Sequence, residues 1–253
     1  MAQSALSHAA KVCRDLGRGM LDLVYPPICL LCDQALPIDQ VDFCPACTKA
    51  LTSDSRSACP RCAATIGPYT NTTNGCPACC DEKYQFGAAL CLGVYENPNV
   101  RAAVLRIKSA AGETLAYALG RAWGREQRDR LRSMNVQFIV PVPLHWWRRW
   151  RRGYDQAAAL AEGLARELKL PCRPGWLRRA RHTPKQTEQT PTQRRENVRN
   201  AFSAVSCAEL RGASVLVVDD VLTTGTTCSE AAKALHRAGA GRVCVAALAR
   251  SKA

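Results

Sequence analysis

The pattern of apolar and polar positions after residue 86 predicts strands that alternate with helices. Four short runs, alternating or continuously apolar, predict strands at 87–95, 137–142, 214–218 and 241–249. Apolar residues recur at helical spacing in 98–107, 113–132, 155–168 and 226–238. This order predicts an α/β domain with a mainly parallel sheet flanked by helices. Ligands of such domains bind at the carboxyl ends of the strands.

The first 25 residues carry a separate helical pattern. Its apolar positions are Ala5, Ala9, Val12, Cys13, Leu16, Met20 and Leu23. They predict an amphipathic helix over 1–25 that ends before Pro26 and packs on its own protein, with a role at a membrane surface as the alternative. No run approaches the roughly 20 apolar residues that span a bilayer, and the N-terminus lacks the pattern of a secretory signal. We therefore expect a cytoplasmic protein without a membrane span.

Nine of the 15 cysteines lie between residues 29 and 80. Eight of them form four C-x-x-C pairs, separated by 11, 11 and 13 residues: Cys29 and Cys32, Cys44 and Cys47, Cys59 and Cys62, Cys76 and Cys79. Four such pairs supply the ligands of two tetrahedral zinc sites. The segment has few apolar residues, so metal binding would supply much of its folding free energy. Unligated or redox-active cysteines are the alternative.

Two ways of pairing these cysteines are compatible with the spacing. A sequential arrangement joins the first two C-x-x-C pairs in one site and the last two in the other, and it needs only short loops. A crossed arrangement is geometrically possible as well. The remaining cysteines are predicted to be core residues, apart from Cys80, which is a spare neighbour of the last pair. They are Cys13, Cys91, Cys172, Cys207, Cys228 and Cys244.

An acidic pair and a hydroxyl-rich turn follow the third predicted strand. Four apolar residues lead into Asp219 and Asp220, and paired carboxylates suit a diol. The turn then leads into a helix, so that backbone N–H groups, hydroxyls and the helix dipole can converge on a phosphate. Gly225 allows close approach of the backbone. An ordinary strand-loop-helix is the alternative, but it leaves the tandem acids unexplained.

This ordering closely resembles the 5-phosphoribosyl pyrophosphate (PRPP) signature of type I phosphoribosyltransferases. The resemblance implies that Asp219 and Asp220 hold the ribose hydroxyls. It implies that the 5-phosphate is held by Thr223, Thr224, Gly225, Thr226 and Thr227. It also implies Mg²⁺, bridging pyrophosphate and ribose hydroxyls.

A basic segment lies upstream, where type I enzymes place the loop that receives pyrophosphate. Its arginines are Arg148, Arg149, Arg151 and Arg152, which can form bidentate bonds to phosphate oxygens. Trp146, Trp147, Trp150 and Tyr154 are interleaved with them. These aromatics suit base stacking in single-stranded DNA, or alternatively they cap the edge of the sheet. The polar stretch 178–202 is predicted to be a catalytic lid, with a solvated basic loop as the alternative.

Charge is unevenly distributed along the chain. Residues 1–80 hold six Lys/Arg and six Asp/Glu of the totals of 35 and 21, which leaves 29 against 15 for the rest. The whole excess of +14 therefore lies after residue 80. Such an excess favours an anionic partner, either a phosphorylated small molecule or nucleic acid.

Together, the cysteine pairs, V-P-V-P-L, R-R-G-Y-D-Q, T-x-x-Q with R-x-x-N-V-x-x-A-F, and V-V-D-D-V-x-T-T-G-T-T resemble the ComF (competence protein F) family. Relatives often carry Phe-Asn where this chain has Tyr154 and Asp155. The resemblance implies a double zinc ribbon at 26–82, a phosphoribosyltransferase domain at 83–253, and a contact between Lys108 and phosphate. A plain surface lysine is the alternative for Lys108.

The resemblance also implies an association with DNA uptake in natural transformation, and DNA-uptake proteins as possible partners. Three functions are compatible with these residues: transfer of phosphoribosyl from PRPP, binding of single-stranded DNA without transferase activity, and PRPP-sensing regulation. The last is the weakest, because the sequence has no evident DNA-reading motif.

Overall fold

The computed structural model describes residues 26–37, 40–52, 57–179 and 198–251. The chain forms two compact units, Met1–Thr48 and Lys49–Ala253. The second unit contains the sheet, its helices and the second pair of C-x-x-C motifs. The helix predicted for 1–25 and most of the predicted lid, 180–197, lie outside the described residues. The domain boundaries proposed from the sequence stay predictions.

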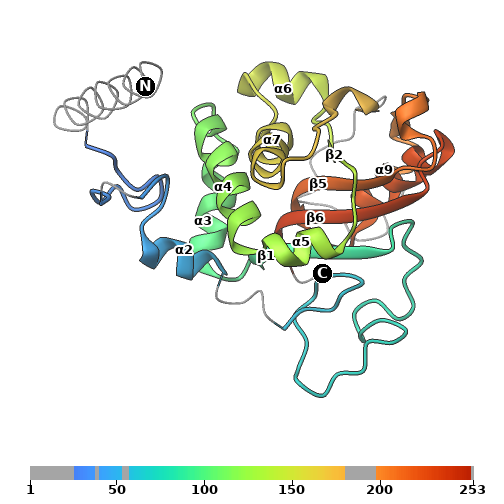
Figure 1. Cartoon of the computed structure of the whole chain (residues 1–253), viewed down its shortest axis with the longest axis horizontal. Helices are drawn as coiled ribbons and strands as arrows, with labels where there is room; N and C mark the ends of the chain where they lie inside the picture. The colour runs from blue at the N-terminus through green and yellow to red at the C-terminus, as the bar shows by residue number, and fades with distance from the viewer. Residues whose placement is uncertain (1–25, 38–39, 53–56, 180–197, 252–253) are drawn as a thin grey trace, which may run out of the picture. The chain divides into compact units, whose positions relative to one another are not determined.

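A four-stranded parallel sheet organises the second unit (Figure 1). Its strand order is β1–β6–β5–β2, and every neighbouring pair is parallel. The strands are β1 (Ala88–Val94), β2 (Phe138–Pro141), β5 (Ser214–Leu222) and β6 (Arg242–Arg250). All four coincide with strands predicted from the sequence. The predicted α/β fold with a mainly parallel sheet is confirmed.

Helices cover this sheet. They are α3 (Pro98–Arg106), α4 (Glu113–Glu126), α5 (Arg128–Ser133), α7 (Gln156–Leu168) and α9 (Thr226–Arg237). Val215 and Val217 of β5 share a buried cluster with Ala231 and Leu235 of α9. Because side chains alternate along a strand, the residues between them point to the opposite face. Helix α7 packs against β2 and β5 and lies beside α4 (Figure 1).

Two glycines set the distance between α4 and α7. A Cβ at Gly120 would lie 2.1 Å from the carbonyl oxygen of Leu160. A Cβ at Gly163 would lie 2.0 Å from the carbonyl oxygen of Tyr117. Any side chain at either position would therefore collide with the backbone of the other helix, so the two helices approach closely through glycine.

The single helix predicted over 113–132 is wrong in one respect, because it is interrupted at Gln127. This residue leaves the helical conformation, with φ −120° and ψ 29°, and separates α4 from α5. Its buried side-chain amide donates to the carbonyls of Cys91 and Leu92 in β1, at 3.4 and 3.3 Å. The break thus coincides with a tertiary contact that helical periodicity does not reveal.

Several short elements were not predicted. They are α2 (Pro45–Thr52), α6 (Trp146–Arg152), the 3-10 helices η1 (Pro174–Trp176) and η3 (Ala208–Leu210), and the strands β3 (Leu177–Arg179) and β4 (Phe202–Ala204). Strands β3 and β4 pair antiparallel, with Arg179 opposite Phe202. The stretch predicted to be a lid therefore begins and ends in a two-stranded ribbon.

The cysteines outside the C-x-x-C pairs divide by burial. Cys91, Cys228 and Cys244 are buried, as predicted for core residues, and Cys80 is exposed. Cys172 and Cys207 are only half-buried. Cys13 lies outside the described residues.

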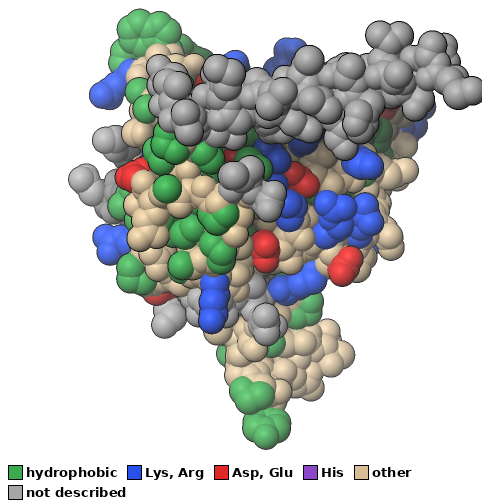
Figure 2. Space-filling view, turned by 60° about the vertical axis from the view of Figure 1, so that its left-hand side comes forward, with side chains coloured by type: hydrophobic (Ala, Val, Ile, Leu, Met, Phe, Trp, Pro, Cys, Tyr) green, Lys and Arg blue, Asp and Glu red, His purple; other side chains and the backbone are tan. Residues whose placement is uncertain are grey.

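Basic side chains gather on one face of the molecule, with acidic side chains between them (Figure 2). Three arginines of this chain converge on one acid: Arg121, Arg125 and Arg128 all lie within 3.5 Å of Glu167.

Among the described residues, no helix has the length and apolar character needed to cross a membrane.

Candidate functional site

The acidic pair lies on β5 beyond the point where its neighbour β2 ends. The pairing of β2 stops at Pro141, opposite Val218. Asp219 pairs in register with Ala247 of β6, and the strand continues to Leu222. The predicted strand 214–218 is therefore too short, because pairing with β6 carries β5 past the acids. The carboxylates emerge where β2 leaves the edge of β5 open.

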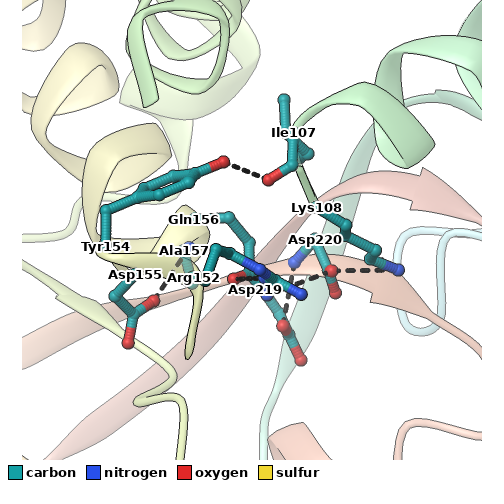
Figure 3. A network of polar contacts seen from close by, with 9 residues as sticks. All are labelled: Ile107, Lys108, Arg152, Tyr154, Asp155, Gln156, Ala157, Asp219 and Asp220. Atoms are coloured by element: carbon teal, nitrogen blue, oxygen red, sulfur yellow. Dashed lines mark hydrogen bonds and ion pairs between the residues drawn. The ribbon is translucent and has the colours of Figure 1, made fainter. Parts of the chain in front are cut away.

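A network of polar contacts surrounds Asp220 (Figure 3). Lys108, which follows α3, places Nζ 3.1 Å from Oδ2 of Asp220. Gln156 of α7 donates through Nε2 to the same oxygen at 3.3 Å, and Arg152 of α6 donates to Oε1 of Gln156. The backbone N–H of Asp220 donates to Oδ1 of Asp219 at 2.8 Å. The structure thus brings together Lys108, Arg152 and the acidic pair from three separate segments.

The two carboxyl groups have opposite electrostatic character. Burial raises the pKa of Asp219 well above its usual range, and the charge of Asp220 raises it further. Burial also opposes ionisation of Asp220, but the Lys108 ammonium and the hydrogen bonds from Lys108, Asp219 and Gln156 together outweigh it, and the pKa of Asp220 lies below its usual range. Asp220 therefore carries the negative charge while Asp219 retains a proton to higher pH. One acid accepts hydrogen bonds and the other can donate one.

The turn after β5 leads into α9 without a capping side chain. Gly225 is the N-cap, at φ 77°, and no side-chain hydrogen bond caps the helix. The first N–H groups of a helix lack internal partners, and they favour an anion. Thr223, Thr224, Thr226 and Thr227 are all half-buried, and the hydroxyls of Thr224 and Thr226 lie 2.8 Å apart. Backbone donors and hydroxyls therefore converge at one helix start.

Arg250, at the end of β6, donates hydrogen bonds to the backbone where this turn begins. It is buried, and its guanidinium donates to the carbonyl of Leu222 at 2.9 Å and to the carbonyls of Thr223 and Ser251. Sequence reasoning missed this residue. The sequence does place an arginine directly after an apolar predicted strand. A charge that is buried at such a position needs a polar partner, and this was the available signal.

Tyr154 and Asp155 position the segments around the network. Asp155 caps α7 through Oδ1, which accepts from the N–H groups of Ala157 and Ala158. Its Oδ2 accepts from the N–H of Leu144 at 2.7 Å. The hydroxyl of Tyr154 donates to the carbonyl of Ile107, next to Lys108. Where the resemblance leads one to expect Phe-Asn, the tyrosine hydroxyl thus gains a role in holding the backbone beside the lysine.

Helix α6 carries the predicted basic and aromatic residues. Trp146 and Trp150 are 68% and 73% exposed, which favours base stacking over the alternative that these tryptophans cap the sheet edge. Trp147 and Trp150 stack, with ring centroids 5.4 Å apart. Arg152 turns toward the acidic network through Gln156. The other three arginines lie on the same helix: Arg149 and Arg151 are exposed, and Arg148 is half-buried.

The eight cysteines of the C-x-x-C pairs form two groups, and these fit two structural zinc ions. Cys29, Cys32, Cys44 and Cys47 form the first group, and Cys59, Cys62, Cys76 and Cys79 form the second. Four sulfurs at about 2.3 Å from zinc in a tetrahedron lie about 3.8 Å apart. The observed Sγ distances include 3.8 Å in the first group and 3.6, 3.8 and 3.9 Å in the second. The sequential pairing is therefore correct.

Two family models match the chain. A double zinc ribbon domain matches residues 20–80, and a phosphoribosyl transferase domain matches residues 155–253. The second match contains the acidic pair, the turn and α9. The protein is thus a phosphoribosyltransferase-type α/β domain preceded by a double zinc ribbon.

Curated relatives are similar over most of their length. Competence protein F from Haemophilus influenzae is 34% identical over 180 residues, 70% of this chain and 78% of the relative. DNA utilization protein YhgH is 34% identical over 61% of this chain in Salmonella typhimurium, and 30% identical over 73% in Escherichia coli O157:H7. These matches span 68% and 81% of the two YhgH chains. The chain belongs to the competence protein F (ComF) family.

Solved structures give a more distant match. Glutamine phosphoribosylpyrophosphate amidotransferase from B. subtilis aligns at 25% identity and a TM-score of 0.36. The alignment covers 56% of this chain and 26% of the amidotransferase.

Proposed function

We propose that this protein binds PRPP, or a related phosphate ligand, at the end of β5. The observation that carries the proposal is the arrangement around the acidic pair. Asp219 and Asp220 stand beside an uncapped helix start that is rich in threonine hydroxyls, and Lys108 and Arg152 face them from other segments. A sugar phosphate presents a diol to the acids and a phosphate to the helix start.

Each part of the site has a role in this proposal. Asp220 accepts hydrogen bonds from a ribose hydroxyl, and Asp219 can also donate one while it retains its proton. The N–H groups and hydroxyls of residues 223–227 bind the 5-phosphate. Lys108 and the arginines of α6 neutralise pyrophosphate. Carboxylate oxygens and phosphates are the ligands that Mg²⁺ prefers, so the bound ion would neutralise the charge of the ligand here.

Phosphoribosyl transfer is the reaction that this site supports best. The C–O bond to pyrophosphate breaks, pyrophosphate leaves with the bonding electron pair, and an acceptor nucleophile forms the new bond to the sugar carbon. The chain's contribution is to orient the ribose and to stabilise the departing charge. Release of pyrophosphate from PRPP in the presence of candidate acceptors measures this activity.

The relatives' names extend the proposal to the cell. One is called a competence protein and the others DNA utilization proteins, so we propose that this chain serves DNA uptake or use, with DNA-uptake proteins as partners. We also place it in the cytoplasm. Its two four-cysteine groups require reduced thiols, and a reducing compartment preserves these.

Single-stranded DNA binding is the second candidate function. The stacked, exposed pair Trp147 and Trp150 supports it, together with the arginines on the same helix. Exposed aromatics beside cations can stack on bases and neutralise phosphates. Competition between PRPP and single-stranded DNA on one zinc-loaded preparation would reveal whether the two ligands share a site.

Calorimetric titration with PRPP and Mg²⁺ tests the first candidate. We expect the double variant Asp219→Asn, Asp220→Asn to stay folded and to bind PRPP at least about tenfold more weakly, because the charge-assisted contact of Asp220 and a hydrogen bond of Asp219 are lost. Glu126→Gln with Asp129→Asn is the matched control, since these two acids are exposed residues of α4 and α5 and lie outside the site. Unchanged affinity in the folded double variant would remove the acidic pair from the ligand site.

A further inference from the structure

Tyr84 lies between the second four-cysteine group and the Gly225 turn. Its ring packs against the buried cluster formed by Cys59, Cys62, Cys76 and Cys79. The same side chain packs against the core of the α/β domain. Tyr84 therefore belongs to both hydrophobic clusters. The metal group and the turn are parts of one compact unit, Lys49–Ala253.

On one side, the aromatic ring contacts the turn directly. A Cβ added to Gly225 would lie 2.9 Å from Cε1 of Tyr84 and 3.4 Å from Cζ of Phe86. The rings of Tyr84 and Phe86 are stacked, with centroids 4.6 Å apart and planes 13° from parallel. The two stacked rings thus pack against the backbone at the start of α9.

On the other side, Arg61 connects the ring to the cysteine group. Arg61 lies between Cys59 and Cys62, and its guanidinium is 5.7 Å from the centroid of the Tyr84 ring. The guanidinium donates to the carbonyls of Cys79 at 2.7 Å and Glu82 at 2.5 Å. These bonds hold the backbone of the segment that leads to Tyr84. The loop that carries the second four-cysteine group must be folded for Arg61 to reach the ring and both carbonyls.

Backbone contacts fix the same segment to the α/β domain. The N–H of Gln85 donates to Oγ of Ser229 in the first turn of α9 at 3.0 Å. The N–H of Ala89 in β1 donates to the carbonyl of Pro60 at 3.0 Å. The path from the cysteines to the turn is therefore continuous through hydrogen bonds and close packing.

We propose that the second four-cysteine group acts, through Arg61 and Tyr84, as a positioning element for the Gly225 turn. Occupancy of that group by zinc then sets how well the turn binds phosphate. A loop with so few apolar residues depends on its metal for folding, so loss of the metal removes the packing that holds Tyr84 against the turn. Loss of the metal leaves the N–H groups of the turn chemically unchanged and changes only their positions. The ligand part of this inference rests on the proposed function.

Hydrogen exchange of the zinc-loaded full chain tests the link without any ligand. In Arg61→Met and in Tyr84→Leu, we expect amides of residues 223–227 to exchange about fivefold faster or more, with two zinc ions retained. Tyr84→Phe should behave as the native protein, since the ring and its packing remain. Tyr69→Leu is the matched control, because Tyr69 belongs to the same loop but is 99% exposed.

Arg61→Met is the decisive variant, because Arg61 does not itself touch the turn in any of the contacts described above. Native exchange rates at residues 223–227 in that variant would overturn the inference. Titration with PRPP is the second measurement, and Arg61→Met and Tyr84→Leu should raise its Kd by a similar factor. If the native protein fails to bind PRPP, the proposed function is wrong, while the exchange rates still decide the positioning role.

Discussion

Nζ of Lys108 lies 3.1 Å from Oδ2 of Asp220, so a cation that follows α3 neutralises one of the two acids of β5. The lysine side chain is 36% exposed and the aspartate side chain 14%. Asp220 is therefore charged and paired before any ligand arrives. A ribose hydroxyl or Mg²⁺ that contacts this oxygen has to share it with Lys108 or displace the lysine toward phosphate.

Replacing Lys108 should reveal the cost of leaving Asp220 unpaired. We expect Lys108→Gln to lower the free energy of unfolding at pH 7 by about 1 to 2 kcal/mol, less than for a fully buried pair because the lysine is partly solvated. The depressed pKa of Asp220 contributes stability above the unfolded pKa, and this contribution is lost as pH falls. The difference from the native protein should therefore shrink toward pH 3. Urea unfolding at both pH values measures it.

Lys233→Gln is the control for that experiment. Lys233 is 31% exposed and forms an i,i+3 pair with Glu230 of α9 at 3.5 Å. We expect Lys233→Gln to cost only about 0.3 to 0.5 kcal/mol, as for other pairs one turn apart on a helix. An equal loss in the two variants, or a loss from Lys108→Gln that does not change with pH, would contradict a special role for the Lys108–Asp220 pair.

Asp219 should destabilise the protein at neutral pH. Its pKa is raised by burial and by Asp220, so above about pH 4 the unfolded state ionises this group more readily than the folded state. Stability therefore falls as pH rises from about 4 through the folded pKa. We expect Asp219→Asn to raise the free energy of unfolding at pH 7 by about 1 kcal/mol or more, and to have little effect at pH 3.

Thermal unfolding across this pH range measures the gain, with Asp129→Asn as the control because Asp129 is an exposed residue of α5. That control should stay within about 0.5 kcal/mol of the native protein. A less stable Asp219→Asn at pH 7 would show that the carboxylate is compensated in the folded state. Asp219 would then have a structural role, with no electrostatic cost that a ligand could relieve.

Local patterns predicted most of the fold, because apolar periodicity reports burial directly. All four strands of the sheet and four of its helices follow from it. The break at Gln127 and the continuation of β5 to Leu222 did not, because each depends on a partner far along the chain: the carbonyls of β1 and the pairing with β6. A continuous apolar run reports a buried strand, but pairing partners leave no local trace.

The candidate site shows the same division. The acids, the glycine and the threonines lie in one contiguous motif, so the sequence places them together. Arg250 and Tyr84 contact that motif only in the folded chain, and neither lies in a sequence motif that would identify it. Their positions depend on where β6 ends and on how the second cysteine group packs, which are tertiary properties.

Gly225→Ala should disturb the turn for two separate reasons. The residue has φ 77°, where a side chain costs about 1 kcal/mol, and its Cβ would lie 2.9 Å from Tyr84. Gly153→Ala measures the first effect alone, because Gly153 has φ 88° with open space around it. We expect Gly225→Ala to cost about 1 to 2 kcal/mol more than Gly153→Ala and to weaken PRPP binding. Equal losses in urea unfolding would show that the Tyr84 ring yields freely.

Protein purified without chelator should contain two zinc ions per chain, because each four-cysteine group matches a tetrahedral site. Cys76→Ser should reduce the content to one, and Cys80→Ser should leave it at two, since Cys80 is exposed and belongs to neither group. Elemental analysis by mass spectrometry decides this. Fewer than about one zinc in the native chain would refute both metal sites.

The last prediction concerns α6, where four arginines and three exposed tryptophans lie within one short helix. If this helix binds single-stranded DNA, alanine in place of Arg148, Arg149, Arg151 and Arg152 should weaken binding and flatten its salt dependence. Each lost phosphate contact lowers the log-log slope by about 0.7. Replacing Trp147 and Trp150 by alanine should weaken binding by about 1 to 3 kcal/mol per stacked base and leave the slope unchanged.

Two comparisons separate this reading from a role for the arginines in pyrophosphate binding alone. Arg152 contacts Gln156 of the acidic network, so Arg152→Ala by itself should weaken PRPP binding more than DNA binding. Alanine at Arg121, Arg125 and Arg128 removes three charges that already converge on Glu167, and it should change the DNA salt slope little. Because counterion release counts phosphate contacts and not overall charge, a native slope in the α6 quadruple variant would exclude α6 from the DNA surface. Fluorescence anisotropy of a labelled oligonucleotide across a salt series gives this slope for every variant.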